Sequence, residues 1–352
     1  MEKNKIHIET NEITQEQKAS LKVRTITAII LVLICVPCLF FGGWLYALLV
    51  GVAAALATYE LIHVTNPSTP HKIILYIFSI VLVESFVFWR FLKANLITLL
   101  GPSSLDFQET IGLIDSLLCN GFQDIEISVI AVLVAALVYF TISFVDEKTK
   151  ITDVFYYISM TLIVGISFQS LLYLRYSPFA QFGLIVEESR LGDFDFKYVQ
   201  SVMLTIYILM GIMFNDIGAY LTGMLFGKHK MNPRISPKKT WEGFVGGVVI
   251  SFAFSSAFAF IMSGAGYEIL PTLTGQGWYW ILPISLALPL VGDIGDFVFS
   301  SIKRHYGVKD FSNLLPGHGG VLDRLDSVLF GSTLAACLLI MINGGWAFAF
   351  GL

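Results

Sequence analysis

Charged residues are scarce in this sequence. Only 14 % of its 352 residues are Asp, Glu, Lys or Arg, whereas soluble proteins carry about a quarter. Hydrophobic residues make up 55 % and the mean hydropathy is +0.74. Apolar runs of a length that crosses a bilayer recur throughout, and the alternation typical of strands is absent. The composition excludes a soluble globular enzyme and predicts an all-α polytopic membrane protein.

Other absences limit the chemistry. Of the four cysteines, Cys35 and Cys38 have CxxC spacing but lie inside an apolar run. A role as small packing residues is therefore a better explanation for them than metal binding or redox chemistry. No His/Cys cluster has zinc spacing, and there is no Walker A motif or GxGxxG after a strand, which excludes ordinary P-loop and Rossmann nucleotide binding. No inverted repeat of the transporter kind is visible.

Nine transmembrane spans are predicted from the apolar runs. They are residues 25–41, 44–62, 73–92, 127–145, 152–174, 199–226, 243–263, 278–299 and 325–343. The chain divides into a polar cytoplasmic tail (1–23), an N-terminal transmembrane region (24–198) and a C-terminal region (199–352) that we expect to carry catalysis. The N-terminal region has five spans and two extracytoplasmic loops, and a short amphipathic piece at 110–118 is expected to lie on the interface.

Lysine and arginine are distributed unevenly over the loops. If the N-terminus is cytoplasmic, 17 of the 22 basic residues fall on that side. The positive-inside rule therefore predicts a cytoplasmic N-terminus, an external C-terminus and cytoplasmic faces for the two polar C-terminal loops.

The first polar cluster lies in the span at 199–226. Asp216 and Tyr220 are four residues apart and share one helix face. An aspartate in an apolar helix costs about 2.5–3.5 kcal/mol on insertion scales, so it normally faces a cavity or a partner. A structural hydrogen bond between helices is an equal alternative.

The second cluster is the segment RISPKKTWEG at 234–243. Lys238 and Lys239 stand side by side, and Thr240 is placed to cap the following helix. Two ammonium groups beside a helix N-terminus would suit phosphate binding. Spacing alone favours the simpler alternative of a positive-inside membrane anchor.

The third cluster begins with Asp293 and Asp296, three residues apart on one helix face. Gly292 and Gly295 permit a close approach of another helix at this level.

The same cluster continues through the polar loop at 300–326, where a Pro-Gly-His-Gly-Gly turn precedes Asp323 and Asp326. The carboxylates could hold a cation, and the turn could offer free backbone N–H groups to phosphate. Oxygen ligands predict Mg²⁺ rather than zinc. For His318, a structural role in the turn and a role as hydrogen-bond donor to a phosphate are weighted equally. The alternative for the whole loop is a structural network in which Lys303 and Arg324 neutralise the carboxylates.

At these residues the chain resembles the phosphatidate cytidylyltransferases, or CDP-diacylglycerol synthases. Their signature requires Ser, Lys-Arg, Lys-Asp, a small residue, Pro or Gly, His-Gly-Gly and Asp-Arg-x-Asp at fixed spacing, and every constrained position is filled across 300–326. These positions are Ser300, Lys303, Arg304, Lys309, Asp310, Ser312, Pro316, His318, Gly319, Gly320, Asp323, Arg324 and Asp326. The resemblance is strong over 215–327 and weak over the first five spans.

The resemblance implies attack of a lipid phosphate on the α-phosphorus of CTP, which gives CDP-diacylglycerol and pyrophosphate. Catalytic roles are expected for Asp296, Asp323, Asp326 and Lys303. Substrate binding is expected of Ser236, Lys238, Lys239, Thr240, Arg304, Lys309, Asp310, His318, Gly319, Gly320, Arg324 and Tyr220. Metal binding is expected of Asp216, Asp293, Asp296 and Asp323, with Mg²⁺ as the cofactor and a second, monovalent cation left open.

One position departs from the family pattern. The acidic residue usual before the signature serine is replaced by Phe299, so Asp293, one turn before Asp296, is a candidate substitute.

The expected partners are CTP, phosphatidate and membrane lipids, without nucleic acid, and a homodimer is left open. The expected location is the bacterial plasma membrane, with the active site facing the cytoplasm. Two alternatives are a CTP-dependent lipid or polyprenol kinase, which would transfer the γ-phosphoryl group, and a transporter of phosphate compounds. The transporter is disfavoured because the charges gather at one membrane face.

Overall fold

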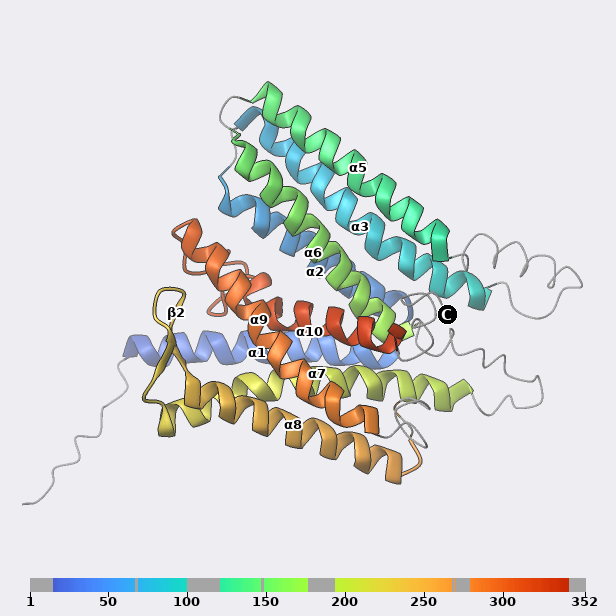
Figure 1. Ribbon diagram of the computed structural model, residues 1–352, viewed down its shortest axis with the longest axis vertical. Coiled ribbons are helices and arrows are strands. Elements are labelled where there is room, and N and C mark those ends of the chain that lie inside the picture. The colour runs from blue at the N-terminus through green and yellow to red at the C-terminus, as the bar shows by residue number, and fades with distance from the viewer. Residues whose placement is uncertain are drawn as a thin grey trace, which may run out of the picture.

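The computed structural model describes residues 15–66, 69–99, 121–146, 149–176, 194–267, 269 and 279–341. This part of the chain forms nine α-helices and one two-stranded hairpin (Figure 1). Each predicted span coincides with a helix. The helices are α1 (Gln15–Phe41), α2 (Gly43–Val64), α3 (Thr69–Leu99), α5 (Gly121–Val145), α6 (Ile151–Tyr176), α7 (Phe194–Phe226), α8 (Trp241–Gly264), α9 (Ile281–His305) and α10 (Leu322–Ile340).

Six helices in the described residues are long and apolar enough to cross a membrane: α1, α2, α6, α7, α8 and α9. Many of their large apolar side chains point outward; Leu33, Leu48 and Met224 are each more than 60 % exposed. In a soluble protein such surfaces would be a liability, whereas in a bilayer they face lipid. The prediction of an all-α polytopic membrane protein is confirmed.

The two halves of the chain share one hydrophobic core. Val50 of α2 and Phe168 of α6 belong to the same cluster of buried residues as Leu288 of α9 and Leu329 of α10. A second, smaller cluster around Tyr139 joins α2, α3, α5 and α6. The N-terminal spans therefore support the C-terminal ones directly.

Glycines bring the C-terminal helices into close contact. A Cβ on Gly247 of α8 would lie 2.6 Å from Asn215 Oδ1 of α7, and one on Gly295 of α9 would lie 2.6 Å from the Asp326 carbonyl oxygen of α10. Small residues permit such backbone approach within membranes, where dispersion contacts stabilise helix pairs. The close approach expected at Gly295 is confirmed.

The segment before α8 forms a hairpin that the sequence analysis missed. β1 (Lys230–Asn232) pairs antiparallel with β2 (Ser236–Thr240). Glu242, in the first turn of α8, accepts hydrogen bonds from the backbone N–H groups of Lys228 and His229. These contacts fix the hairpin against the helix, so a segment too short for a strand prediction becomes ordered.

Several helix ends lie together on one side of the helical bundle (Figure 1). Thr27, near the start of the apolar stretch of α1 (Lys22–Phe41), donates to the Pro316 carbonyl oxygen. The Tyr156 ring near the start of α6 packs on Tyr306 at the end of α9. Thr65, at the end of α2, is hydrogen-bonded to Tyr157. These are the ends that the positive-inside rule assigns to the cytoplasm. The amphipathic piece predicted at 110–118 lies outside the described residues, as does most of the loop at 175–198.

Candidate active site

A pocket of about 410 Å³ opens between α7, the hairpin, α8 and α9. Its walls combine two kinds of side chain. Three lysines and two aspartates form the polar part, and Tyr220, Met224 and Phe244 contribute apolar surface. The polar residues are Lys230, Lys238, Lys239, Asp216 and Asp293. Such a mixture suits a molecule that is anionic at one end and apolar at the other.

Lys239 links the hairpin to α9. Its ammonium nitrogen lies 2.6 Å from Asp293 Oδ1 and 2.8 Å from Asp296 Oδ2. Burial alone would lower the pKa of Lys239, but the charges of Asp296 and Asp293 outweigh it and raise this pKa above its ordinary value. Lys239 is therefore an ammonium ion at neutral pH. Asp293 also accepts from Asn215 Nδ2 at 2.9 Å, so both of its oxygens are engaged.

Four carboxylates from three helices surround this point. Asp216 of α7 and Asp326 of α10 lie within electrostatic range of each other and of Asp296. Asp296 Oδ1 accepts a hydrogen bond from Ser300 at 3.1 Å, one turn along α9. With Asp293, these groups bring a formal charge of −4 that Lys239 only partly offsets.

The acidic cluster does not form a complete metal site by itself. Among the described residues, no three His, Cys, Asp or Glu side chains are grouped closely enough to hold a metal by themselves. Mg²⁺ typically takes one or two carboxylates, with water and substrate phosphates completing its shell. The excess of carboxylates at the pocket therefore fits a Mg²⁺ that binds together with a nucleotide, and does not fit an all-protein cage.

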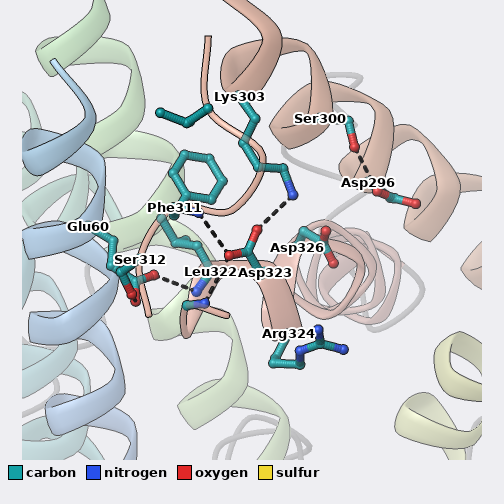
Figure 2. A network of polar contacts seen from close by, with 12 residues as sticks. Glu60, Asp296, Ser300, Lys303, Phe311, Ser312, Leu322, Asp323, Arg324 and Asp326 are labelled. Carbon is teal, nitrogen blue, oxygen red and sulfur yellow. Dashed lines mark hydrogen bonds and ion pairs between the residues drawn. The ribbon is translucent and has the colours of Figure 1, made fainter. Parts of the chain in front are cut away.

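Asp323 lies in a closed network one helical turn before Asp326 (Figure 2). Lys303 Nζ lies 2.7 Å from Asp323 Oδ1, and the two side chains are 10 % and 4 % exposed. Asp323 Oδ2 accepts from the backbone N–H groups of Phe311 and Gly320, both at 2.9 Å. The carboxylate holds the two ends of the loop that precedes α10.

Most N–H groups of the glycine-rich turn are already engaged within the protein, contrary to the prediction. The N–H groups of His318 and Gly319 donate to the Leu315 carbonyl oxygen, and Gly320 donates to Asp323. Those of Val321 and Leu322 donate to Glu60. The positive φ of Gly319 (85°) allows the tight turn that makes these bonds. The turn is a structural element, and its donors at His318, Gly319 and Gly320 are already used.

Glu60 was not identified as a site residue by the sequence analysis. It lies in α2, more than 250 residues away in sequence, and approaches the start of α10 (Figure 2). One signal was available, because an ionisable residue inside a predicted span is unusual and normally has a specific partner. The identity of that partner depends on packing.

Comparison with known proteins gives a consistent assignment. The model of the cytidylyltransferase family matches residues 22–342. The chain belongs to the cytidylyltransferase family.

Several bacterial relatives carry the name phosphatidate cytidylyltransferase. The one from Bacillus subtilis (strain 168) is 40 % identical over 149 residues, which is 42 % of this chain and 49 % of the relative. The one from Staphylococcus aureus (strain COL) is 42 % identical over 135 residues, 38 % of this chain and 48 % of the relative. The match to each of these relatives spans about half of the relative's length.

The remaining predicted binding residues of this family member occupy three kinds of position. Thr240 caps α8 as predicted, because its Oγ1 accepts from the Gly243 N–H at 3.1 Å. Arg304 donates to the Ile235 and Val308 carbonyl oxygens, and Arg324 donates to that of His318, so both stabilise loops. The others differ in exposure: Lys238, Lys309, Asp310 and Tyr220 are exposed, while Ser236 and His318 are half-buried.

Phe299 explains the departure from the family pattern. Its side chain is fully buried, and its ring packs edge-on against Phe311 and Phe330. Position 299 therefore faces the core behind the loop rather than the pocket. Asp293, by contrast, lines the pocket, so the two positions are not geometrically equivalent.

Proposed function

We propose that this cytidylyltransferase transfers a cytidylyl group from CTP to phosphatidate and releases pyrophosphate. One observation carries the proposal: a lysine-lined pocket with an apolar wall adjoins a cluster of carboxylates at the ends of membrane helices. The curated names of the bacterial relatives support the same substrates.

In the proposed reaction an oxygen of the lipid phosphate attacks the α-phosphorus of CTP. The bond between that phosphorus and the oxygen bridging to the β-phosphate breaks, and pyrophosphate leaves. Both reactants are anions, so positioning and cationic groups supply most of the catalysis. Bound Mg²⁺ would neutralise phosphate charge at the carboxylates.

The chain's own residues have separate tasks in this scheme. Lys230 and Lys238 reach into the pocket and would bind the phosphates of CTP. Lys239 holds Asp293 and Asp296 in place and keeps their charge partly balanced until substrate arrives. Tyr220 and Met224, on the apolar wall, would contact the glycerol and acyl portions of the lipid.

The enzyme is proposed to act in the bacterial plasma membrane with its site facing the cytoplasm. The six apolar helices and the bacterial relatives support a membrane location. Labelling of single cysteines tests the orientation, in a background that lacks the native cysteines. Cysteine at Ser236 or Leu314 should react from the cytoplasmic side only; reaction of the two from opposite faces would overturn the one-site scheme.

The activity is tested with purified protein, phosphatidate, Mg²⁺ and CTP labelled at either the α- or the γ-phosphorus. We expect the α-label to enter the lipid and the γ-label to leave as pyrophosphate. Entry of the γ-label into the lipid would instead identify a CTP-dependent kinase. The Asp296→Asn variant serves as the inactive control.

A further inference from the structure

Glu60 is a fully buried carboxylate in the N-terminal half of the molecule. It accepts hydrogen bonds from Ser312 Oγ at 2.6 Å, the Val321 N–H at 2.8 Å and the Leu322 N–H at 2.9 Å. Two of these donors belong to the start of α10, and the third belongs to the loop before it (Figure 2). A single side chain of α2 is thus hydrogen-bonded both to the start of α10 and to the loop before it.

Backbone donors and a hydroxyl group satisfy this carboxylate. In the described part of the chain, no basic side chain lies within ion-pair distance of Glu60. The first N–H groups of a helix lack intrahelical partners, and the helix dipole favours a negative charge beside them. Glu60 therefore caps α10 from another helix, which is consistent with the absence of a side-chain cap from Val321 at the N-cap position.

Gly320 makes this contact possible. A Cβ at position 320 would lie 2.6 Å from Glu60 Oε2, closer than real atoms approach. The last glycine of the His-Gly-Gly turn is thus needed for access of Glu60 to the helix end. This contact alone explains why position 320 requires glycine, and phosphate binding need not be invoked.

The anchored segment carries two acidic residues one helical turn apart. Asp323 lies in the first turn of α10 and holds Lys303, and Asp326 follows one turn later, in the carboxylate cluster. A shift of the helix start would move both carboxylates relative to Asp296 on α9. Displacements of about 1 Å at a reacting centre can cost about a hundredfold in rate.

We propose that Glu60 is a positioning residue for the cytidylyl transfer, acting through α10 and the loop at 311–322. The inference rests on the proposed function, since it assumes that this loop serves catalysis. Glu60 contacts no pocket-lining residue; it sets where α10 begins and therefore where Asp326 lies.

The decisive variant is Glu60→Gln, which keeps the volume but replaces one acceptor oxygen with an N–H₂ group facing backbone donors. The matched control is Glu84→Gln, which changes an acid of the neighbouring helix α3 that borders a separate pocket. Hydrogen exchange of the 311–322 amides and steady-state kinetics are measured on both, in the same detergent.

In Glu60→Gln we expect exchange at 311–322 to speed up and kcat to fall, each by about 10- to 100-fold, because hydrogen bonds to a charged acceptor contribute about 1.5–3 kcal/mol. The KM for CTP should change less than about threefold, because Glu60 does not contact the pocket. Glu84→Gln should change neither quantity. Ser312→Ala removes one donor and should shift exchange and kcat in the same direction by a smaller factor.

Unchanged exchange in Glu60→Gln would overturn the anchoring role. Faster exchange with a wild-type kcat would overturn the positioning role and leave Glu60 as a purely structural cap. If Glu60→Gln does not fold, Ser312→Ala decides by the same two readouts. If the wild type forms no CDP-lipid, the proposed function fails, and the exchange measurement still decides whether Glu60 anchors the loop.

Discussion

Two carboxylate sites lie along the α9–α10 pair, and they differ in what their oxygens contact. Asp296 belongs to the pocket site, is 26 % exposed at its side chain and has a lysine and a serine as partners. Asp323 belongs to the loop site, is 4 % exposed at its side chain and is bound by Lys303 and two backbone N–H groups. Both belong to acidic pairs with the same spacing of three residues.

The difference indicates a division of labour between the two sites. A partly exposed carboxylate beside a pocket can exchange its protein partners for a metal ion or a substrate. One that is buried and bound on both oxygens mainly fixes the backbone around it, and breaking its ion pair leaves an uncompensated charge. The predictions below test this division.

The largest effect is expected at the pocket. Asp296→Asn should lower kcat by about 100-fold or more, because the amide keeps the shape but loses the charge that would hold Mg²⁺ and orient Lys239. Exchange at 311–322 should remain as in the wild type. The control Asp153→Asn changes an acid at the start of α6, outside both sites, and should keep normal turnover. A near-normal kcat in Asp296→Asn would contradict the assignment of the pocket.

At the loop site the main effect should be on stability. Lys303→Met or Asp323→Asn alone should each lower the free energy of unfolding by about 3–5 kcal/mol, because each leaves one buried charge unpaired. The double variant should lose less than the sum of the two, as measured by denaturant unfolding in detergent micelles. Additive losses would show that the two side chains act independently.

Asp323→Asn also distinguishes the two sites. We expect faster exchange at the Phe311 and Gly320 amides together with lost activity, and no rescue by added Mg²⁺. Rescue by Mg²⁺ with unchanged exchange would place Asp323 among the metal ligands and would remove the contrast with Asp296.

The adjacent residues Lys238 and Lys239 are expected to have different roles at the pocket. Lys238→Ala should raise the KM for CTP by about tenfold with kcat largely retained, because Lys238 lines the pocket and pairs with no carboxylate among the described residues. Lys239→Ala should instead lower kcat, since it releases Asp293 and Asp296. Arg234→Ala, at the tip of the hairpin, is the matched control. Equal kinetics for all three variants and the wild type would favour a simple membrane anchor.

The smallest effect is expected from the hydrogen bond to Asp296. Ser300→Ala removes one neutral donor and should lower kcat by about 2- to 10-fold. Ser301→Ala is the matched control, because the Ser301 hydroxyl donates to the Phe297 carbonyl oxygen within α9. A similar loss in both variants would point to a general effect on the helix.

Local patterns were sufficient to predict much of this molecule. The nine apolar runs predicted nine helices, the position of Thr240 predicted a helix cap, and Gly295 predicted close helix packing. Each of these depends on residues within a few positions of one another or on hydropathy averaged over a span. The signature at 300–326 likewise identified the family from spacing alone.

Tertiary structure decided which polar groups are partners. The sequence placed Lys239 near phosphate, whereas packing of the hairpin on α9 pairs it with Asp293 and Asp296. It offered the glycine-rich turn as an anion cradle, whereas Asp323 binds the Gly320 N–H of the turn and Glu60 binds the next two N–H groups. Hydropathy determines that a segment enters the membrane, because burial of apolar surface is additive and local. The partner of a buried charge is set by which helices pack side by side, and for Glu60 that partner lies more than 250 residues along the chain.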